Sequence, residues 1–396
     1  MSSAMLPARS ALAESPTFPG AEQPGAGLGE TSLWRRRVLA PFRSMGRLIS
    51  NLFAVLALVG MLAVVAAIPL VQILVLGYFL EASGRVARTG KFRHGLPGLP
   101  LARRFGLATL CIALLLLPAT ILGSLHDDAL LIAPNATRTE VLGIVSGLVG
   151  LATLGHLCLA LLLGAEWHRF VRPIANLREA YRRLRERRFF RSVWENATSF
   201  VRQLHLPKLA WLGLKGFVLT LVWLVIPSAM LAAGGNRPIV SLLGGLAMMI
   251  VVLYVPFAQA HFAAEQRWRA IVDLRTVRYR FARAPMAFLL ALVLTLLMTI
   301  PLYLMKVEML PRDILWLPTL IFVVTILPLH LITSWAYSRG IRRERPVTWM
   351  LRWPCRLLML PVATMYAYVV FLSQYTSWRG AMGLFEHHAF LVPAPF

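Results

Sequence analysis

Histidine is the residue type in this chain that is best placed to do chemistry within apolar surroundings. His156 and His330 lie within or at the edge of long apolar segments, and so does His261. A buried imidazole can relay protons or bind a substrate in a transporter. A buried histidine that only hydrogen-bonds a neighbouring hydroxyl group is the simpler alternative. His156 and His330 are therefore the transport-site candidates that the sequence offers.

The acidic residues are the second group that could carry chemistry. None of the 17 falls at the middle of a predicted span, and Glu81, Glu166 and Glu265 lie at span ends. Proton-coupled transporters usually place an ionisable residue at the middle of the membrane. This distribution argues against antiport through a buried carboxylate.

Two short runs of histidine and acid, His126–Asp128 and Glu386–His388, could bind a divalent metal on the outer side. Adjacent residues seldom converge on one ion, so a membrane enzyme would need the two runs to meet. The chain has no phosphate-binding loop, no HExxH and no GxSxG motif. Its three cysteines lack the spacing of a zinc site. We therefore expect no catalytic residue, no cofactor and no metal.

The composition excludes an ordinary soluble domain. Of the 396 residues, 58% are hydrophobic and 15% are charged, and the mean hydropathy is +0.67. Soluble domains carry about 25% charged residues. The long uncharged runs have the length of helices that cross a hydrocarbon core about 30 Å thick. The chain is expected to be an all-α, polytopic helical membrane protein.

The positive charge of the chain is large and unevenly placed. The net charge is +24, and only four of the 41 basic residues are lysine. Clustered arginines can contact nucleic-acid phosphates, but here they lie between apolar segments and are missing from alternate loops. That is the positive-inside pattern of membrane proteins. We therefore expect no nucleic-acid partner, a multi-pass protein of the plasma membrane and a cytoplasmic N-terminus.

The N-terminal residues differ from the rest of the chain. Residues 1–33 are rich in Ala, Pro, Gly, Ser and Glu, which predicts a disordered tail. The first long apolar run begins only at Leu52, so the tail does not have the pattern of a secretory signal. Residues 34–396 are expected to form a single helical membrane domain.

The apolar run Leu52–Leu80 is flanked by basic residues on both sides. A straight helix of this length would measure about 43 Å, which is overlong for one span and too short for two. Pro69, near its middle, removes a hydrogen bond and bends a helix. We favour a re-entrant hairpin of two half-helices, with both ends in the cytoplasm, over a single tilted span whose N-terminus lies outside.

Seven further spans follow, and their loops alternate between basic and non-basic. They are Gly106–Gly123, Val141–Ala165, Leu209–Ala233, Ile239–Ala263, Ala287–Met305, Leu315–Trp335 and Leu357–Trp378. Gly143, Gly147 and Gly150 place small residues on one face of the second of these, where another helix can approach closely. The expected fold has about seven full transmembrane helices plus the Pro-broken hairpin, or eight spans if the first segment crosses.

Residues 166–208 form the longest polar stretch and are predicted to be a basic amphipathic helical region. Apolar residues recur at steps of three and four, first as Ile174, Leu177, Tyr181 and Leu184 and then as Phe190, Val193, Trp194, Ala197, Val201 and Leu204. Such a region can lie on the anionic inner leaflet. It could equally form a helical hairpin packed on the cytoplasmic face of the protein itself. Arg182, Arg183, Arg187 and Arg188 are the candidates for contact with lipid headgroups or with a cytoplasmic partner.

Two passages resemble a known family. The first runs from Gly77 to Gly90 and continues to Leu96-Pro97, and the second runs from His261 to Ala270 and on through Asp273-Leu274-Arg275. Both are similar to conserved loops of the domain of unknown function 4013 family, which comprises prokaryotic polytopic membrane proteins with no assigned activity. The chain departs from the family pattern at Gly98-Leu99-Pro100, where acidic and tryptophan residues usually follow. The resemblance implies a bacterial inner-membrane protein with cytoplasmic flanks at both loops, and it implies no mechanism.

The sequence favours a non-enzymatic helical bundle whose Arg-rich cytoplasmic face binds anionic lipid headgroups or a cytoplasmic partner. A small-molecule or lipid transporter is the second hypothesis, with its site between the Pro-broken hairpin and the spans that contain His156 and His330. A membrane-embedded lipid-modifying enzyme is the third.

Overall fold

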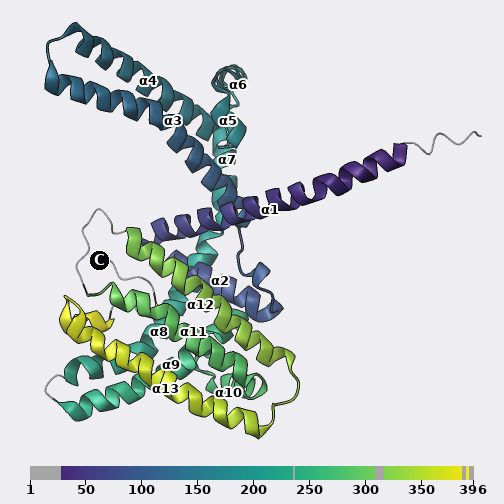
Figure 1. Ribbon diagram of the computed structural model, residues 1–396, viewed down its shortest axis with the longest axis vertical. Coiled ribbons are helices and arrows are strands. Elements are labelled where there is room, and N and C mark those ends of the chain that lie inside the picture. Colours follow the sequence, from purple (N-terminus) through teal and green to yellow (C-terminus); the bar gives the residue numbers. More distant parts are fainter. Residues whose placement is uncertain (1–27, 235–236, 308–315, 386–388, 392–396) are drawn as a thin grey trace, which may run out of the picture. The chain divides into compact units, whose positions relative to one another are not determined.

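The computed structural model describes residues 28–234, 237–307, 316–385 and 389–391, with side chains from residue 45 onward, and these residues contain helices and no strand (Figure 1). The predicted disordered tail, residues 1–33, lies mostly outside them. The α-helices are α1 (Leu28–Ala66), α2 (Ile73–Thr89), α3 (Leu99–Ile132), α4 (Thr137–Leu162), α5 (Trp167–Val171), α6 (Pro173–Arg185), α7 (Phe189–Leu204), α8 (Leu206–Ala233), α9 (Pro238–Glu265), α10 (Leu274–Arg283), α11 (Pro285–Leu304), α12 (Trp316–Arg342) and α13 (Trp349–Thr376). Short 3-10 helices are η1 (Phe92–His94), η3 (Trp268–Val272) and η5 (Gly380–Phe385).

Eight helices in the described part of the chain are long and apolar enough to cross a membrane. Seven of them correspond to the seven predicted spans. These seven are α3, α4, α8, α9, α11, α12 and α13. The eighth is the portion of α1 from Met45 to Ala66. The prediction of an all-α polytopic membrane protein is confirmed.

The first apolar run is interrupted at Pro69, as predicted. Helix α1 ends at Ala66 and α2 begins at Ile73, and Leu70 between them adopts a positive φ of 67°. A proline lacks the amide that the helix needs and restricts the preceding residue, so the helix stops there. The second half of the run belongs to α2, which at 17 residues is shorter than the helices able to span. Re-entry of the whole segment remains a prediction.

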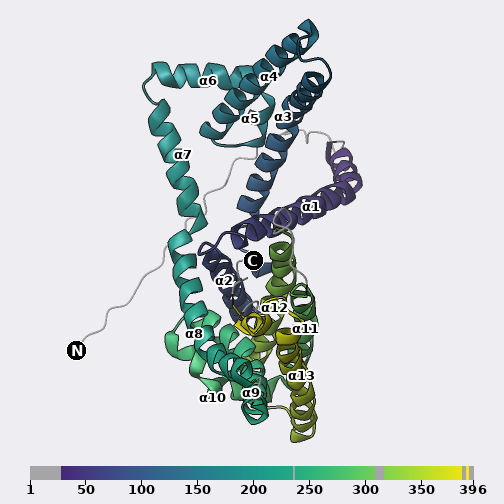
Figure 2. The same ribbon diagram turned by 90° about the vertical axis from the view of Figure 1, so that its left-hand side faces the viewer.

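The described contacts divide the chain into two units, residues 1–50 and 51–396. In the second unit, α2 packs against α8, α9 and α12, and α11 and α13 complete the same hydrophobic core. Twelve of the 17 residues of α2 are buried. Figure 2 shows α2 between α8 and α12. Helix α2 is therefore the central element of a six-helix bundle.

Glycine lets α2 and α8 touch backbone to backbone. A Cβ atom added to Gly77 would lie 2.0 Å from the carbonyl oxygen of Leu209, and one added to Gly213 would lie 2.0 Å from that of Ile73. The two glycines therefore face the partner helix reciprocally. Such small-residue contacts are how helices approach closely in membranes.

Helices α3 and α4 form an antiparallel hairpin with its own small apolar cluster, which includes Ala108, Leu157 and Phe170. Most of its large apolar side chains are exposed, as lipid-facing side chains would be. Gly143 is the one member of its glycine series that a neighbour approaches closely, because its added Cβ would meet the His126 ring at 2.7 Å. The run His126–Asp128 lies in the last turns of α3 rather than in a loop.

The chain returns to the bundle at its C-terminal end. Residues 389–391 are buried, and the Phe390 ring stacks on Tyr366 with centroids 6.1 Å apart. The Gln259 amide of α9 donates to the Thr220 hydroxyl of α8 at 2.8 Å and to the Phe390 carbonyl oxygen at 2.7 Å. Because this amide is buried, both bonds are needed to offset its lost hydration. They tie the C-terminal segment to α8 and α9.

Candidate functional site

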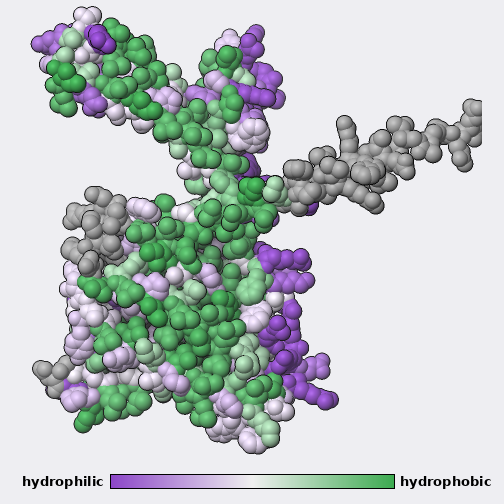
Figure 3. Space-filling view, in the orientation of Figure 1, coloured by the Kyte–Doolittle hydropathy of each residue, from purple (hydrophilic) through white to green (hydrophobic). Residues whose placement is uncertain are grey.

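The basic end of the bundle is formed by the last turns of α2, α9 and α12 together with η3 and α10. Figure 3 shows hydrophilic residues gathered along one side of the bundle, beside a largely hydrophobic face. Several of the arginines here cap helices. Arg88 donates to the carbonyl oxygens of Ala263 (3.3 Å) and Ala264 (3.0 Å) at the end of α9, and Arg342 donates to that of Thr89 at the end of α2. Cations at these termini satisfy free carbonyls and favour the helix dipole.

The two passages that resemble a known family pack against each other at the basic end. A Cβ atom on Gly84 of α2 would lie 2.3 Å from the carbonyl oxygen of Ala263 in α9, so only glycine fits there. The Arg88 bonds join the same two passages. Residues about 180 positions apart in the sequence therefore form one structural unit, a pairing that neither passage reveals alone.

Glu81 is the most buried carboxylate of this unit, with 6% of its surface exposed. Its two oxygens lie 3.0 Å from Nε of Arg85 and 3.0 Å from Nζ of Lys208, and Gln266 approaches at 3.5 Å. Burial by itself raises the pKa of Glu81, but the hydrogen bonds and charges of Lys208 and Arg85 outweigh it and lower the pKa. The spacing of Glu81 and Arg85, i and i+4, is the sequence signal that marks this pair.

A cavity of about 520 Å³ adjoins this ion-pair cluster. Its walls come from α1, α2, the start of α3 and the α7–α8 junction, and they are mainly apolar. Glu81, Arg85 and Lys208 provide its charged lining. Two cations face one carboxylate, so the net charge is positive and an anionic group fits better than a metal ion.

The pH dependence of stability tests whether Glu81 is an ionised carboxylate that is stabilised by Arg85 and Lys208. A carboxylate whose folded pKa is lowered stabilises the fold above its unfolded value, here 4.5, and that contribution is lost as pH falls through the folded value. We expect wild type to have a higher Tm than Glu81→Gln at pH 7, and the gap to narrow below pH 4.5. Thermal unfolding of the detergent-solubilised protein across this range measures the gap. A gap that is constant with pH would contradict the assignment.

A second polar chain links α9 to α12 at the basic end. The hydroxyl of Tyr337 and Nδ1 of His261 are 2.7 Å apart, and Nε2 of His261 lies 3.8 Å from Asp273. Asp273 caps α10 by accepting from the Thr276 amide at 3.0 Å, and the Thr276 hydrogen bonds lower its pKa. Because both rings are buried, this chain fixes the corner between the helices.

The two predicted transport-site histidines are not brought together. His156 of α4 bonds through Nε2 to the Phe170 carbonyl oxygen at 2.9 Å, beside the small apolar cluster of the α3–α4 hairpin. His330 of α12 is buried in the main bundle, with its ring 5.6 Å from that of Phe79. Neither histidine lines the cavity beside Glu81.

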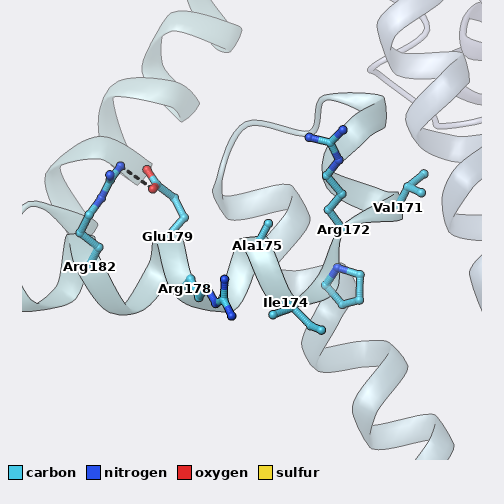
Figure 4. Close-up of a pocket in the computed structure, with 8 residues that line it drawn as sticks. Val171, Arg172, Ile174, Ala175, Arg178, Glu179 and Arg182 are labelled. Atoms are coloured by element: carbon cyan, nitrogen blue, oxygen red, sulfur yellow. Dashed lines mark hydrogen bonds and ion pairs between the residues drawn. The ribbon is translucent and has the colours of Figure 1, made fainter.

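The four predicted headgroup arginines lie on α6 and on the turn that follows it. Arg182 and Arg183 both pair with Glu179, at 2.5 and 2.7 Å, and Figure 4 shows the Arg182–Glu179 pair. The Arg183 and Arg182 bonds lower the pKa of Glu179. Arg187 adopts a positive φ of 56° in the α6–α7 turn, and Arg188 directly precedes α7. The structure thus clusters all four.

The apolar faces of α6 and α7 are uncovered. Phe190 and Trp194 are 77% and 71% exposed, and the predicted apolar series of α6 is exposed throughout, namely Ile174, Leu177, Tyr181 and Leu184. Helix α6 packs on α4, and its buried residues, Asn176 and Ala180, lie outside the apolar series, whereas α7 has no buried residue. Large apolar side chains left in water are costly, and an exposed apolar face of this kind marks a site of contact with a membrane or with another protein.

The residues proposed for an enzyme are only partly described. Asp127 and Asp128 lie in α3, whereas the run Glu386–His388 lies outside the described residues. Within the described part of the chain, no group of three or more His, Cys, Asp or Glu side chains could hold a metal.

No protein-family model, curated protein or solved structure matches this chain. The candidate sites therefore rest on the residues and their geometry.

Proposed function

We propose that this membrane protein uses α6 and α7 to bind anionic lipid headgroups on the cytoplasmic leaflet of the plasma membrane. The supporting observation is that both helices leave an apolar face uncovered while carrying the arginines of the α6–α7 turn. Apolar side chains enter the acyl boundary and arginines meet the phosphates in such a surface helix. The N-terminus is then cytoplasmic, in keeping with the arginine distribution.

The alternative, a hairpin packed on the protein itself, has less support. Packing would bury the apolar series of α6 and α7, but the buried residues of α6 are Asn176 and Ala180, and the apolar series of α6 is exposed. A cytoplasmic protein could cover the same faces, and the experiment below separates it from lipid.

Fluorescence quenching by lipid tests the proposal on the full chain. Cys111, Cys158 and Cys355 are replaced by alanine, and Trp194→Cys carries a bimane label in nanodiscs that contain brominated lipid. We expect strong quenching with phosphatidylglycerol and weak quenching with phosphatidylcholine alone. Each arginine near an anionic surface contributes about 1 kcal/mol, and Glu179 compensates part of the charge. The variant R182Q/R183Q/R187Q/R188Q should therefore weaken surface contact by at least about tenfold.

The matched control is R267Q/R269Q/R275Q/R345Q, which removes the same charge from exposed arginines outside α6 and α7. It should leave the quenching unchanged. Equal quenching with both lipids, or no effect of the four α6–α7 substitutions, contradicts lipid binding and favours a protein partner on these faces.

A transporter is the second candidate, and the cavity beside Glu81 is the observation that favours it. The site would then involve Glu81, Arg85 and Lys208 in place of His156 and His330. A cysteine at Val65, which lines the cavity, should react with an impermeant maleimide from one side of the membrane. Absence of labelling from either side would oppose transport through this cavity.

We also propose that this chain belongs to the domain of unknown function 4013 family. It is supported by the mutual packing of the two resembling passages, through Gly84, Arg88 and Ala263. A prokaryotic origin would make the membrane the bacterial inner membrane.

A further inference from the structure

A groove of about 410 Å³ opens on the bundle between α9, α10, α11 and α13. Its apolar wall includes Leu253, Phe257, Phe288, Leu357 and Leu360. Two arginines, Arg278 of α10 and Arg356 of α13, complete its lining. We call this cavity the lipid groove.

The two arginines are held toward the groove by aromatic rings rather than by acids. Nε of Arg278 donates to the Tyr254 hydroxyl at 2.9 Å, and its guanidinium lies 5.4 Å from the centre of that ring. The Arg356 guanidinium lies 5.7 Å from the Phe281 ring and 5.9 Å from the Trp353 ring. Such cation–π contacts orient a guanidinium without neutralising it.

Neither guanidinium forms an ion pair with any carboxylate among the described residues. Both arginines are exposed. Two uncompensated positive charges at the edge of an apolar groove complement an anion with an apolar portion. Guanidinium groups bind phosphate oxygens in a bidentate manner, so a phosphate is the favoured anion.

The position along α13 places the groove at a membrane interface. Arg356 is the last charged residue before the apolar stretch from Leu357 to Trp378. Trp353 and Tyr254 also line the groove, and Trp and Tyr concentrate where headgroups meet acyl chains. The arginines therefore sit at headgroup depth and the apolar wall at acyl depth.

We propose that the lipid groove binds one anionic phospholipid, with its phosphate between Arg278 and Arg356 and an acyl chain along the apolar wall. Basic pockets between transmembrane helices bind lipid headgroups in this way. The inference rests on the proposed function in that both require anionic lipid at the same leaflet. It concerns a single bound molecule and uses none of the α6–α7 residues.

Native mass spectrometry of the full-length protein tests the proposal. The protein is purified with phosphatidylcholine, and phosphatidylglycerol is then titrated in. We expect one phosphatidylglycerol to be retained with preference over phosphatidylcholine. R278Q/R356Q should weaken that binding at least tenfold, whereas R269Q/R275Q, which removes two nearby exposed arginines outside the groove, should not.

Two further variants separate the chemistry of the headgroup from that of the chain. R278K/R356K keeps both positive charges but loses the bidentate guanidinium groups, so it should recover only part of the affinity for phosphatidylglycerol. Leu360→Trp fills the apolar wall and should reduce retention while both arginines remain. Glycerol 3-phosphate, which has the phosphate and no acyl chain, should not compete.

Equal retention by wild type and R278Q/R356Q, or competition by glycerol 3-phosphate at the affinity of the lipid, overturns the proposal. The variant R182Q/R183Q/R187Q/R188Q distinguishes it from the proposed function. That variant should lose surface quenching of α7 and keep the single bound lipid. If R278Q/R356Q loses the lipid while the quenching of α7 never depended on phosphatidylglycerol, the groove stands and the α6–α7 proposal fails.

Discussion

Replacing Gly77 or Gly213 with alanine should destabilise the bundle more than any other single-methyl change in α2 or α8. Each new Cβ would lie 2.0 Å from a carbonyl oxygen of the partner helix, at Leu209 or Ile73, and neither backbone can move without separating the helices. Overpacking a dense core typically costs 1–3 kcal/mol, and backbone obstruction at the central helix places the cost at the upper end, about 3 kcal/mol. Thermal unfolding followed by size-exclusion chromatography in detergent should show a lower Tm and loss of the monodisperse peak.

The matched controls are Gly147→Ala and Gly150→Ala in α4, where an added Cβ meets nothing within 4 Å. Alanine is the better helix former by about 0.5–1 kcal/mol, so these changes should be neutral or slightly stabilising. Equal Tm values for Gly77→Ala and Gly147→Ala would show that α2 and α8 are not in backbone contact.

The double variant R85M/K208M is the other change for which we expect a large loss of stability. It leaves the Glu81 carboxylate buried with Gln266 as its remaining partner. Removing the partners of a buried charge costs about 3–5 kcal/mol, because the charge keeps its desolvation penalty and loses its compensation. The same unfolding assay should show a fall in Tm that becomes smaller at acidic pH, where Glu81 is protonated.

The decisive comparison adds Glu81→Leu to the double variant. Removing the orphaned charge should restore much of the stability, because a buried ion cluster can be replaced by apolar side chains at little cost. Lys91→Met with Arg93→Met controls for the loss of two exposed cations of the basic end. If the triple variant is no more stable than the double, burial of an unpaired Glu81 is not the cause.

In the sequence, the arginines of the basic loops cannot be told apart. The structure divides them into two kinds. Arg88 and Arg342 cap the ends of α9 and α2 and hold the bundle together. Arg278 and Arg356 have no acidic partner in the described residues and face a groove. Loss of the first kind should unfold the basic end, whereas loss of the second should change what the protein binds.

Much of the candidate site was beyond a reading of the sequence. Glu81 falls near the end of an apolar run, and nothing local shows that Lys208, 127 positions away, reaches it. The histidine candidates failed to meet for the same reason, because hydrophobic pattern shows that a segment is apolar and not which helix it packs against. The placement of Arg182, Arg183, Arg187 and Arg188 beside exposed apolar faces could be predicted from the sequence, because it depends on local amphipathic spacing alone.

The sequence by itself determined that the chain is helical, that it crosses a membrane many times and that its first apolar run breaks at Pro69. These features follow from composition, run length and the chemistry of proline, all of which act locally. Tertiary structure alone decided that α2 is the centre of the bundle, that Gly84 meets Ala263 and that Arg278 and Arg356 share a groove. Those outcomes depend on which small residues let two backbones approach, and that is a property of helix pairs rather than of any one segment.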